Sequence, residues 1–413
     1  MRTRLPTDAI GPQDQSPFGA QRRTLLRWLA LGSGASGLLG LAEPAWADVR
    51  QRATKTGSAR LAAVWQDKTG EVVQDWAGVL QVDAGANGYT WRIGKSLKLP
   101  TRGHGVQRLA DGQLVFSARR PGDWLVRWNP SKAEAHWAWM EEDRCFNGHV
   151  VVGSQSTAQK VSSTAAVLLT TETDLENSQG CIGLRHAITL KKLAEWPTHG
   201  MDPHELLVLP SAMGNLPAGT LIVANGGIPT QSETGRSKKW IDRMDPSLVA
   251  LHPEDGRLLG QWRLPDPRLS TRHLAWDAQR QLLGIALQAE HDDDQRTRAP
   301  IFAIWDGTAL SLAQGQPSLA GYGGSVECAP GADGGFVVSC PKSDCTAWFS
   351  ADGRFLRTVA QTDVCPLALD GSLLWSGGGH EVGRHVPTDK VWHAADASGA
   401  VQALQFDNHW RLY

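Results

Sequence analysis

Short apolar runs of strand length alternate with turn residues along nearly the whole chain, and one unit recurs. A clear copy is residues 202–210, where a histidine leads an apolar run, followed by a second apolar run at residues 219–227. Similar units with a leading histidine begin near residues 103, 148 and 272, and two units without one begin near 325 and 363. Self-similarity at a period of a few tens of residues indicates a repeat architecture.

The turns between these runs predict hairpins. An Asp-Gly pair suits a hairpin turn because glycine readily adopts the positive φ that such turns require. Six pairs punctuate the chain, and their aspartates are Asp111, Asp255, Asp306, Asp333, Asp352 and Asp370. No long segment shows the 3.6-residue period of an amphipathic helix. The sequence therefore predicts an all-β fold.

Repeat spacing predicts the kind of all-β fold. The histidine-led units start roughly 40 to 70 residues apart, which is the size of a four-stranded propeller blade with insertions. The strands that begin at Leu61 lack a histidine-led first strand, and residues 407–412 supply one with the pattern of residues 104–109. We therefore predict a seven-bladed β-propeller, with the ring closed by pairing the C-terminal strand with the N-terminal blade. Six or eight blades are the alternatives.

Composition narrows the function classes. The chain has 413 residues, of which 41% are hydrophobic and 20% charged, and its formal net charge is −1. These values predict a folded globular body and no nucleic-acid partner. The sequence lacks a Gly-x-Ser-x-Gly elbow, a Cys-x-x-Cys-His haem motif, a phosphate loop and a His-Glu-x-x-His motif. Nothing in it therefore favours nucleophilic catalysis.

The N-terminal segment predicts export. Paired arginines at residues 22–23 precede an apolar run at 28–41 and the small-x-small site Ala45-Trp46-Ala47, as in a twin-arginine signal peptide. The run is shorter than a membrane span requires, and an uncleaved N-terminal anchor is the alternative. We expect no membrane span in the mature chain. We predict a signal peptide at 1–47, a polar leader at 48–60, a single propeller domain at 61–413 and a periplasmic location.

The recurring histidines are candidate metal ligands. The first strand of each propeller blade lines the central channel, so residues at equivalent starts converge there. Imidazole is a common ligand of Fe, Cu and Zn. The predicted metal ligands are His104, His149, His204, His273 and His409. The alternative is that each histidine only ties its strand end to a neighbour by a hydrogen bond.

Polar residues beside these histidines are candidate ligand-binding groups, namely Arg102, Glu172, Glu205, Asn225, Arg236 and Arg272. The arginines are suited to an anionic ligand at the channel mouth, and the glutamates to oxygen ligation or support of a histidine. The Asn-Gly-Gly turn at residues 225–227 presents backbone amides. Structural salt bridges to Glu172 or Asp202, and a plain turn, are the alternatives.

The chain carries distinctive blocks at residues 102–105, 119–122, 146–149, 171–172, 199–206, 223–228, 235–236, 244–248, 269–275 and 407–409. Together these blocks resemble an exported bacterial family known as the domain of unknown function 1513. The resemblance covers nearly the whole mature chain. It implies the propeller seen in the β-chain of quinoprotein amine dehydrogenases and a link to imelysin-like iron-uptake proteins, with no established activity. The chain departs from the family pattern at Cys145, at Gln231 and at residues 184–185.

Three functions are compatible with these predictions. The first is a periplasmic protein that binds a transition metal or small ligand at a histidine-rich channel mouth and takes part in iron acquisition. The second is a protein–protein interaction platform without a metal. The third is a periplasmic oxidoreductase or lyase. A propeller supports all three, so the fold alone does not choose between them.

Overall fold

The computed structural model describes residues 58–85, 88–140, 143–161, 163, 166–230, 240–331, 333–379, 381–386, 393–397 and 404–413. The chain divides into two compact units, 1–47 and 48–413, and all described residues belong to the second. The predicted signal peptide and Arg236 lie outside the described residues. No helix within the described ranges is both long and apolar enough to cross a membrane.

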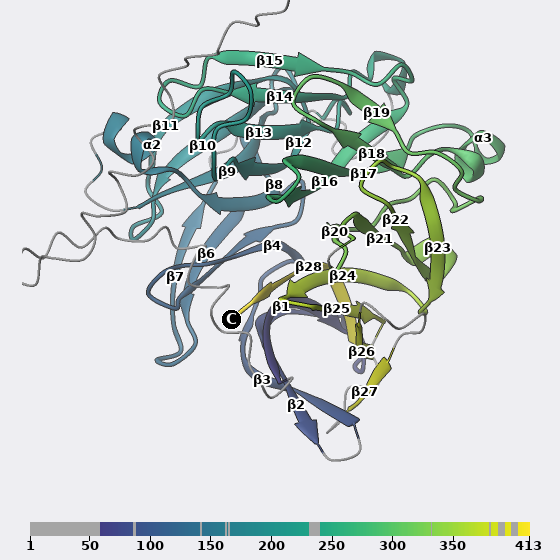
Figure 1. Cartoon of the computed structure of the whole chain (residues 1–413). Coiled ribbons are helices and arrows are strands. Elements are labelled where there is room, and N and C mark those ends of the chain that lie inside the picture. Colours follow the sequence, from purple (N-terminus) through teal and green to yellow (C-terminus); the bar gives the residue numbers. More distant parts are fainter. Residues whose placement is uncertain are drawn as a thin grey trace, which may run out of the picture. The chain divides into compact units, whose positions relative to one another are not determined.

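The predicted all-β class is confirmed (Figure 1). Five four-stranded antiparallel sheets follow one another along the chain. The first contains β4 Gly103–Arg108, β5 Leu114–Ala118, β6 Trp124–Asn129 and β7 Glu134–Trp139. The second contains β8 Arg144–Val152, β9 Val167–Asp174, β10 Gln179–His186 and β11 Lys192–Met201. The third contains β12 Pro203–Val208, β13 Leu221–Asn225, β14 Ser247–Leu251 and β15 Leu258–Trp262. The fourth contains β16 Leu269–Asp277, β17 Leu282–Ala289, β18 Phe302–Trp305 and β19 Leu310–Leu312. The fifth contains β20 Val326–Cys328, β21 Phe336–Cys340, β22 Cys345–Phe349 and β23 Phe355–Ala360.

Both ends of the described chain meet in a sixth sheet. Its order is β1-β2-β3-β27-β26-β25-β24-β28, and it closes on itself. Its strands are β1 Ala59–Asp67, β2 Gln74–Gly85, β3 Gly88–Lys98, β24 Val364–Asp370, β25 Leu373–Gly378, β26 Glu381–His385, β27 His393–Ala397 and β28 Leu404–Leu412. The C-terminal β28 pairs antiparallel with β1, whereas its parallel pairing with β24 is a single residue pair. β1 begins within the predicted polar leader.

Helices are few and short. They are α2 Gln155–Lys160, α3 Asp293–Arg298 and the 3-10 turns η1 Ile241–Arg243 and η2 Pro341–Ser343. Each of the six Asp-Gly pairs lies between two paired antiparallel strands, and every one of their glycines has a positive φ. The predicted hairpins are therefore confirmed. In the tightest of them, Asp370 pairs with Leu373 across a two-residue loop.

A continuous series of contacts links the first strands of the five four-stranded sheets with β24 and β28 of the sixth. β4 contacts β8, β8 contacts β12, β12 contacts β16, β16 contacts β20, β20 contacts β24, β24 contacts β28, and β28 contacts β4. Buried apolar side chains fill the space between consecutive sheets. One such cluster joins Phe302 of the fourth sheet to Phe336 and Phe349 of the fifth. The series brings together strand starts that are far apart in the sequence.

Candidate functional site

All five predicted histidines lie in one cluster. They come from the first strands of four sheets, β4, β8, β12 and β16, and from the C-terminal strand β28. The centroids of neighbouring imidazole rings lie 4.6 to 5.9 Å apart. All but the half-buried His204 are less than one-tenth exposed. The histidines of the repeat units therefore meet at one place, as the repeat pattern predicts.

Each clustered histidine lies where its strand is out of register with its neighbour. On β4, Gly103 pairs with Ala118 and Val106 with Phe116, so the strand carries one extra residue at His104. Similar irregularities occur at the histidines of β8, β12, β16 and β28. A β-bulge bends its strand and redirects a side chain, and bulges are common beside functional sites. The irregularities turn the five rings toward one another.

Two glycines allow the close approach of β4 and β8. A Cβ atom at Gly105 would lie 2.2 Å from the carbonyl oxygen of Gly148. A Cβ atom at Gly148 would lie 2.7 Å from the His104 ring, and Gly148 has a φ of +105°. Side chains rarely adopt that backbone conformation. Both glycines are therefore required for His104 and His149 to pack as they do.

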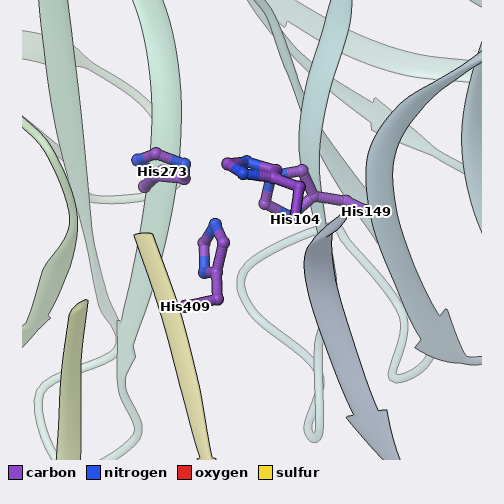
Figure 2. A group of neighbouring side chains, drawn as sticks. All are labelled: His104, His149, His273 and His409. Atoms are coloured by element: carbon purple, nitrogen blue, oxygen red, sulfur yellow. The ribbon is translucent and has the colours of Figure 1, made fainter. Parts of the chain in front are cut away.

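Four of the five rings have the arrangement of a metal site. One nitrogen from each of His104, His149, His273 and His409 lies within 4.8 Å of the others. Figure 2 shows these rings converging from separate strands. Within the described residues, each ring has a buried nitrogen without a hydrogen-bond partner: Nε2 of His104, His149 and His409, and Nδ1 of His273.

His204 differs from the other four because both of its ring nitrogens have partners. Its Nε2 shares a hydrogen bond of 2.9 Å with Nε2 of His273. Its Nδ1 lies 3.5 Å from Nη1 of Arg272, which donates to it. The structure therefore places His204 beside the four-histidine group, in contact with one of its members.

Burial keeps the cluster neutral. It lowers the pKa values of His149, His204, His273 and His409 well below the usual range, and neighbouring positive groups add to the effect. Burial also lowers the pKa of His104, although Asp407 opposes this. Neutral imidazole is the form that binds a metal ion, so protons compete little for these nitrogens at neutral pH.

Asp407 anchors His104. Its Oδ1 lies 2.5 Å from Nδ1 of His104, and its Oδ2 accepts from Nε of Arg102 at 2.6 Å and Nη1 of Arg119 at 3.1 Å. Burial opposes ionisation of Asp407, but these partners outweigh it and hold the pKa of that carboxyl well below its usual range. Asp407 is therefore a buried carboxylate that fixes the orientation of the His104 ring.

Glu205 lies beside another histidine of the cluster, His149. Its Oε2 accepts a hydrogen bond of 2.8 Å from the backbone nitrogen of Leu274, and its Oε1 lies 3.7 Å from Nδ1 of His149. Burial raises the pKa of Glu205 to about 7, while Arg411 opposes the shift. Two histidines of the cluster, His104 and His149, therefore each have a carboxyl group beside the ring.

The other predicted ligand-binding residues are divided between this site and elsewhere. Arg272 is buried beside the cluster, and its Nη1 donates a hydrogen bond of 3.0 Å to Oδ2 of Asp202. Glu172 is buried on β9 and forms ion pairs with Arg185 and Lys192, which places it in a structural charge cluster of the second sheet. Asn225 donates to the Thr198 carbonyl and the Ser247 hydroxyl, so its amide supports the sheet.

Sequence reasoning missed the role of Asp407. The available signal was its position two residues before His409, in a unit where the equivalent position of β8 is Asn147. Asn147 and Asn408 also tie adjoining strand starts together. The Asn147 amide donates to the carbonyl of Pro203 at 3.0 Å, and the Asn408 amide donates to that of Gly324 at 2.5 Å.

Solved structures with a similar fold include virginiamycin B lyase from Staphylococcus aureus. Its TM-score is 0.50 at 9% identity, covering 72% of this chain and 85% of the lyase. Hydrazine synthase from Kuenenia stuttgartiensis has a TM-score of 0.52 at 9% identity, and the match covers 76% of this chain and 92% of the synthase chain. The Dos1 propeller has a TM-score of 0.49 at 12% identity, and the match covers 79% of this chain and 78% of the Dos1 chain. These likenesses concern the fold alone, and the lyase is a β-propeller protein.

No curated protein matches the chain in sequence. A family profile does match it, over residues 97–413, which include all five clustered histidines and the residues that anchor them. The resemblance predicted from the sequence blocks is thereby confirmed. The chain belongs to the family described as protein of unknown function (DUF1513).

Proposed function

We propose that this protein binds one transition-metal ion, Fe, Cu or Zn, through His104, His149, His273 and His409. The observation that carries the proposal is the convergence of four imidazoles, each with a buried nitrogen that lacks a hydrogen-bond partner among the described residues. An unsatisfied buried polar atom costs about 1–3 kcal/mol. Four such atoms belong to this one cluster of rings, and a bound metal ion would satisfy those that face it.

The spacing of the four nitrogens is near that of a metal site. With Zn–N bonds of about 2.0–2.1 Å, ligand nitrogens in a tetrahedral site lie about 3.3 Å apart. The four nitrogens here lie within 4.8 Å of one another, so metal binding would draw them together by up to about 1.5 Å. Neutral imidazoles suit zinc, copper and iron, whereas magnesium and calcium prefer oxygen ligands.

The surrounding residues support the same proposal. Ligating histidines usually donate their second ring nitrogen to a carboxylate, which fixes the ring and raises its basicity. His104 has Asp407 in that position, and Glu205 lies near His149. His204 contacts His273 and is assigned here to positioning that ring.

We propose that the scaffold is a seven-bladed propeller whose last blade closes the ring. Five separate sheets have four strands each, and the eight strands of the sixth divide into β24–β27 and β28 with β1–β3. The antiparallel pairing of β28 with β1 spans residues from Leu61 to Asp67, while links between the two halves are few. This division gives seven four-stranded units.

The periplasmic location and the partners are also proposals. They rest on the arginine pair at residues 22–23, the Ala47 site and the family resemblance, which suggests imelysin-like partners in iron acquisition. Cell fractionation of a variant with Lys at both arginine positions tests the location. Retention of the precursor in the cytoplasm supports export by the twin-arginine route, and unchanged export contradicts it.

Metal titration tests the proposed function. We expect the metal-free protein to bind one equivalent of Co²⁺ or Cu²⁺ with visible absorption bands, and His149→Ala to abolish these bands. His204→Ala is the matched control because its ring lies in the same cluster but outside the four-nitrogen group. It should retain one equivalent. Absence of binding by the unaltered protein, or equal loss in both variants, would refute the four-histidine site.

A further inference from the structure

A small cavity adjoins the histidine cluster. Its volume is about 30 Å³. It is lined by His104, Arg119, Arg120, Asn147, His204, Arg272, His273, Gln288, Tyr322 and Asn408. A water molecule needs about 10–15 Å³ of such space, so the cavity accommodates a molecule of a few non-hydrogen atoms. Three of its lining side chains are guanidinium groups.

Two aspartates beside this cavity are each shared by two arginines. Asp202 pairs with both Arg120 and Arg272, and Asp407 pairs with both Arg102 and Arg119. Four guanidinium groups therefore share two carboxylates. Glu290 is a third carboxylate, whose charge acts on Arg272. The guanidinium groups beside the cavity therefore share their carboxylates with one another.

Three of these charged side chains are buried. Arg120, Arg272 and Asp202 are each less than one-tenth exposed. The Nε of Arg272 has no hydrogen-bond partner within the described part of the chain. A buried charge is stabilised by an opposite charge with hydrogen-bonding oxygens, and guanidinium groups match the planar geometry of carboxylates.

We propose that this cavity binds a small oxyanion of carboxylate geometry, held by Arg119, Arg120 and Arg272 next to the histidine cluster. Tyr322 adds a neutral donor, since burial raises the pKa of its phenol. The volume suits an anion such as formate, or the carboxylate end of a larger ligand. The inference rests on the arginines that line the cavity, and not on the proposed metal site.

Calorimetric titration of sodium formate into the chelator-treated protein, free of chloride, tests the inference. We expect saturable binding to the unaltered protein and at least tenfold weaker binding to Arg119→Gln. Arg102→Gln is the matched control, because Arg102 bonds the same Oδ2 of Asp407 but does not line the cavity. Its affinity should change less than threefold.

Tyr322→Phe provides a second variant with little effect on folding, and it should weaken formate binding severalfold. Absence of saturable formate binding to the unaltered protein, or equal effects of Arg102→Gln and Arg119→Gln, would overturn the proposal. A parallel titration with benzoate distinguishes the source of the carboxylate. Exclusion of benzoate supports a free small anion, whereas binding that depends on Arg119 supports the end of a larger ligand.

Because the metal is removed beforehand, the two proposals fail independently. Formate binding by a protein that takes up no Co²⁺ or Cu²⁺ would support the anion site and refute the metal site. Metal binding without formate binding would do the reverse. Elemental analysis of the titrated sample confirms that the metal is absent.

Discussion

Trp410 offers a direct test of how strongly the C-terminal strand holds the fold together. It lies on β28, pairs with Ala63 of β1 and is 3% exposed. Its ring meets Phe406 at 5.2 Å and fills the space that a Cβ atom at Gly377 would enter. A side chain from the last strand therefore packs within both halves of the sixth sheet.

Replacing Trp410 with Ala removes a large buried side chain. Substitutions of this kind reduce the free energy of unfolding by about 3–5 kcal/mol. We expect the upper part of that range, because paired strands on both sides restrict collapse into the space. Urea unfolding followed by far-ultraviolet circular dichroism measures the change, with a chelator present so that loss of metal does not contribute.

Trp139→Ala is the control for this measurement, since that side chain is 59% exposed. Its free energy of unfolding should change by less than about 0.5 kcal/mol. A Trp410→Ala effect below about 1 kcal/mol, or one equal to the control, would show that β28 contributes little to global stability. The proposed closure of the ring by the last strand would then be wrong.

Three further changes have distinct expected results. Gly148→Ala places a Cβ atom against His104, so metal titration should show at least tenfold weaker binding, and unchanged affinity would contradict the packing. Glu172→Gln breaks buried ion pairs, so thermal denaturation should show a free energy of unfolding lower by about 3 kcal/mol. The metal content should stay constant, and a loss of metal would show that Glu172 is a ligand. Cys340 and Cys345 lie directly opposite on paired strands, so mild oxidation should remove two free thiols in a thiol assay, and persistent reactivity would contradict their proximity.

The sequence predicts the strands and the convergence of the histidines because both follow from local pattern. Apolar runs and Asp-Gly turns define the hairpins, and the repeat places His104, His149 and His409 at comparable starts. Equivalent strand starts must meet if the units are arranged in a ring. The gathering of residues more than 300 positions apart is thus readable from the repeat.

The details of the site depend on pairings between strands, which the sequence does not specify. Asp407 orients His104 only because β28 lies beside β4. Arg185 of the neighbouring strand donates a hydrogen bond to Glu172 and balances its charge. The position of Glu172 in a histidine-led unit therefore does not make it a ligand-binding residue. The register irregularities at the histidines depend on how each strand pairs with its neighbour. His204 differs from the other four histidines through its contact with Arg272.

Elemental analysis of the untagged, mature protein from cells supplied with iron, copper and zinc tests the central claim most directly. A variant combining His149→Ala and His409→Ala is analysed beside it, with His136→Ala as control because His136 is an exposed residue outside the cluster. We predict one equivalent of a transition metal in the unaltered protein and in the control, and none in the double variant. Absence of metal from all three, or its retention in the double variant, would contradict the account and favour a protein–protein interaction platform.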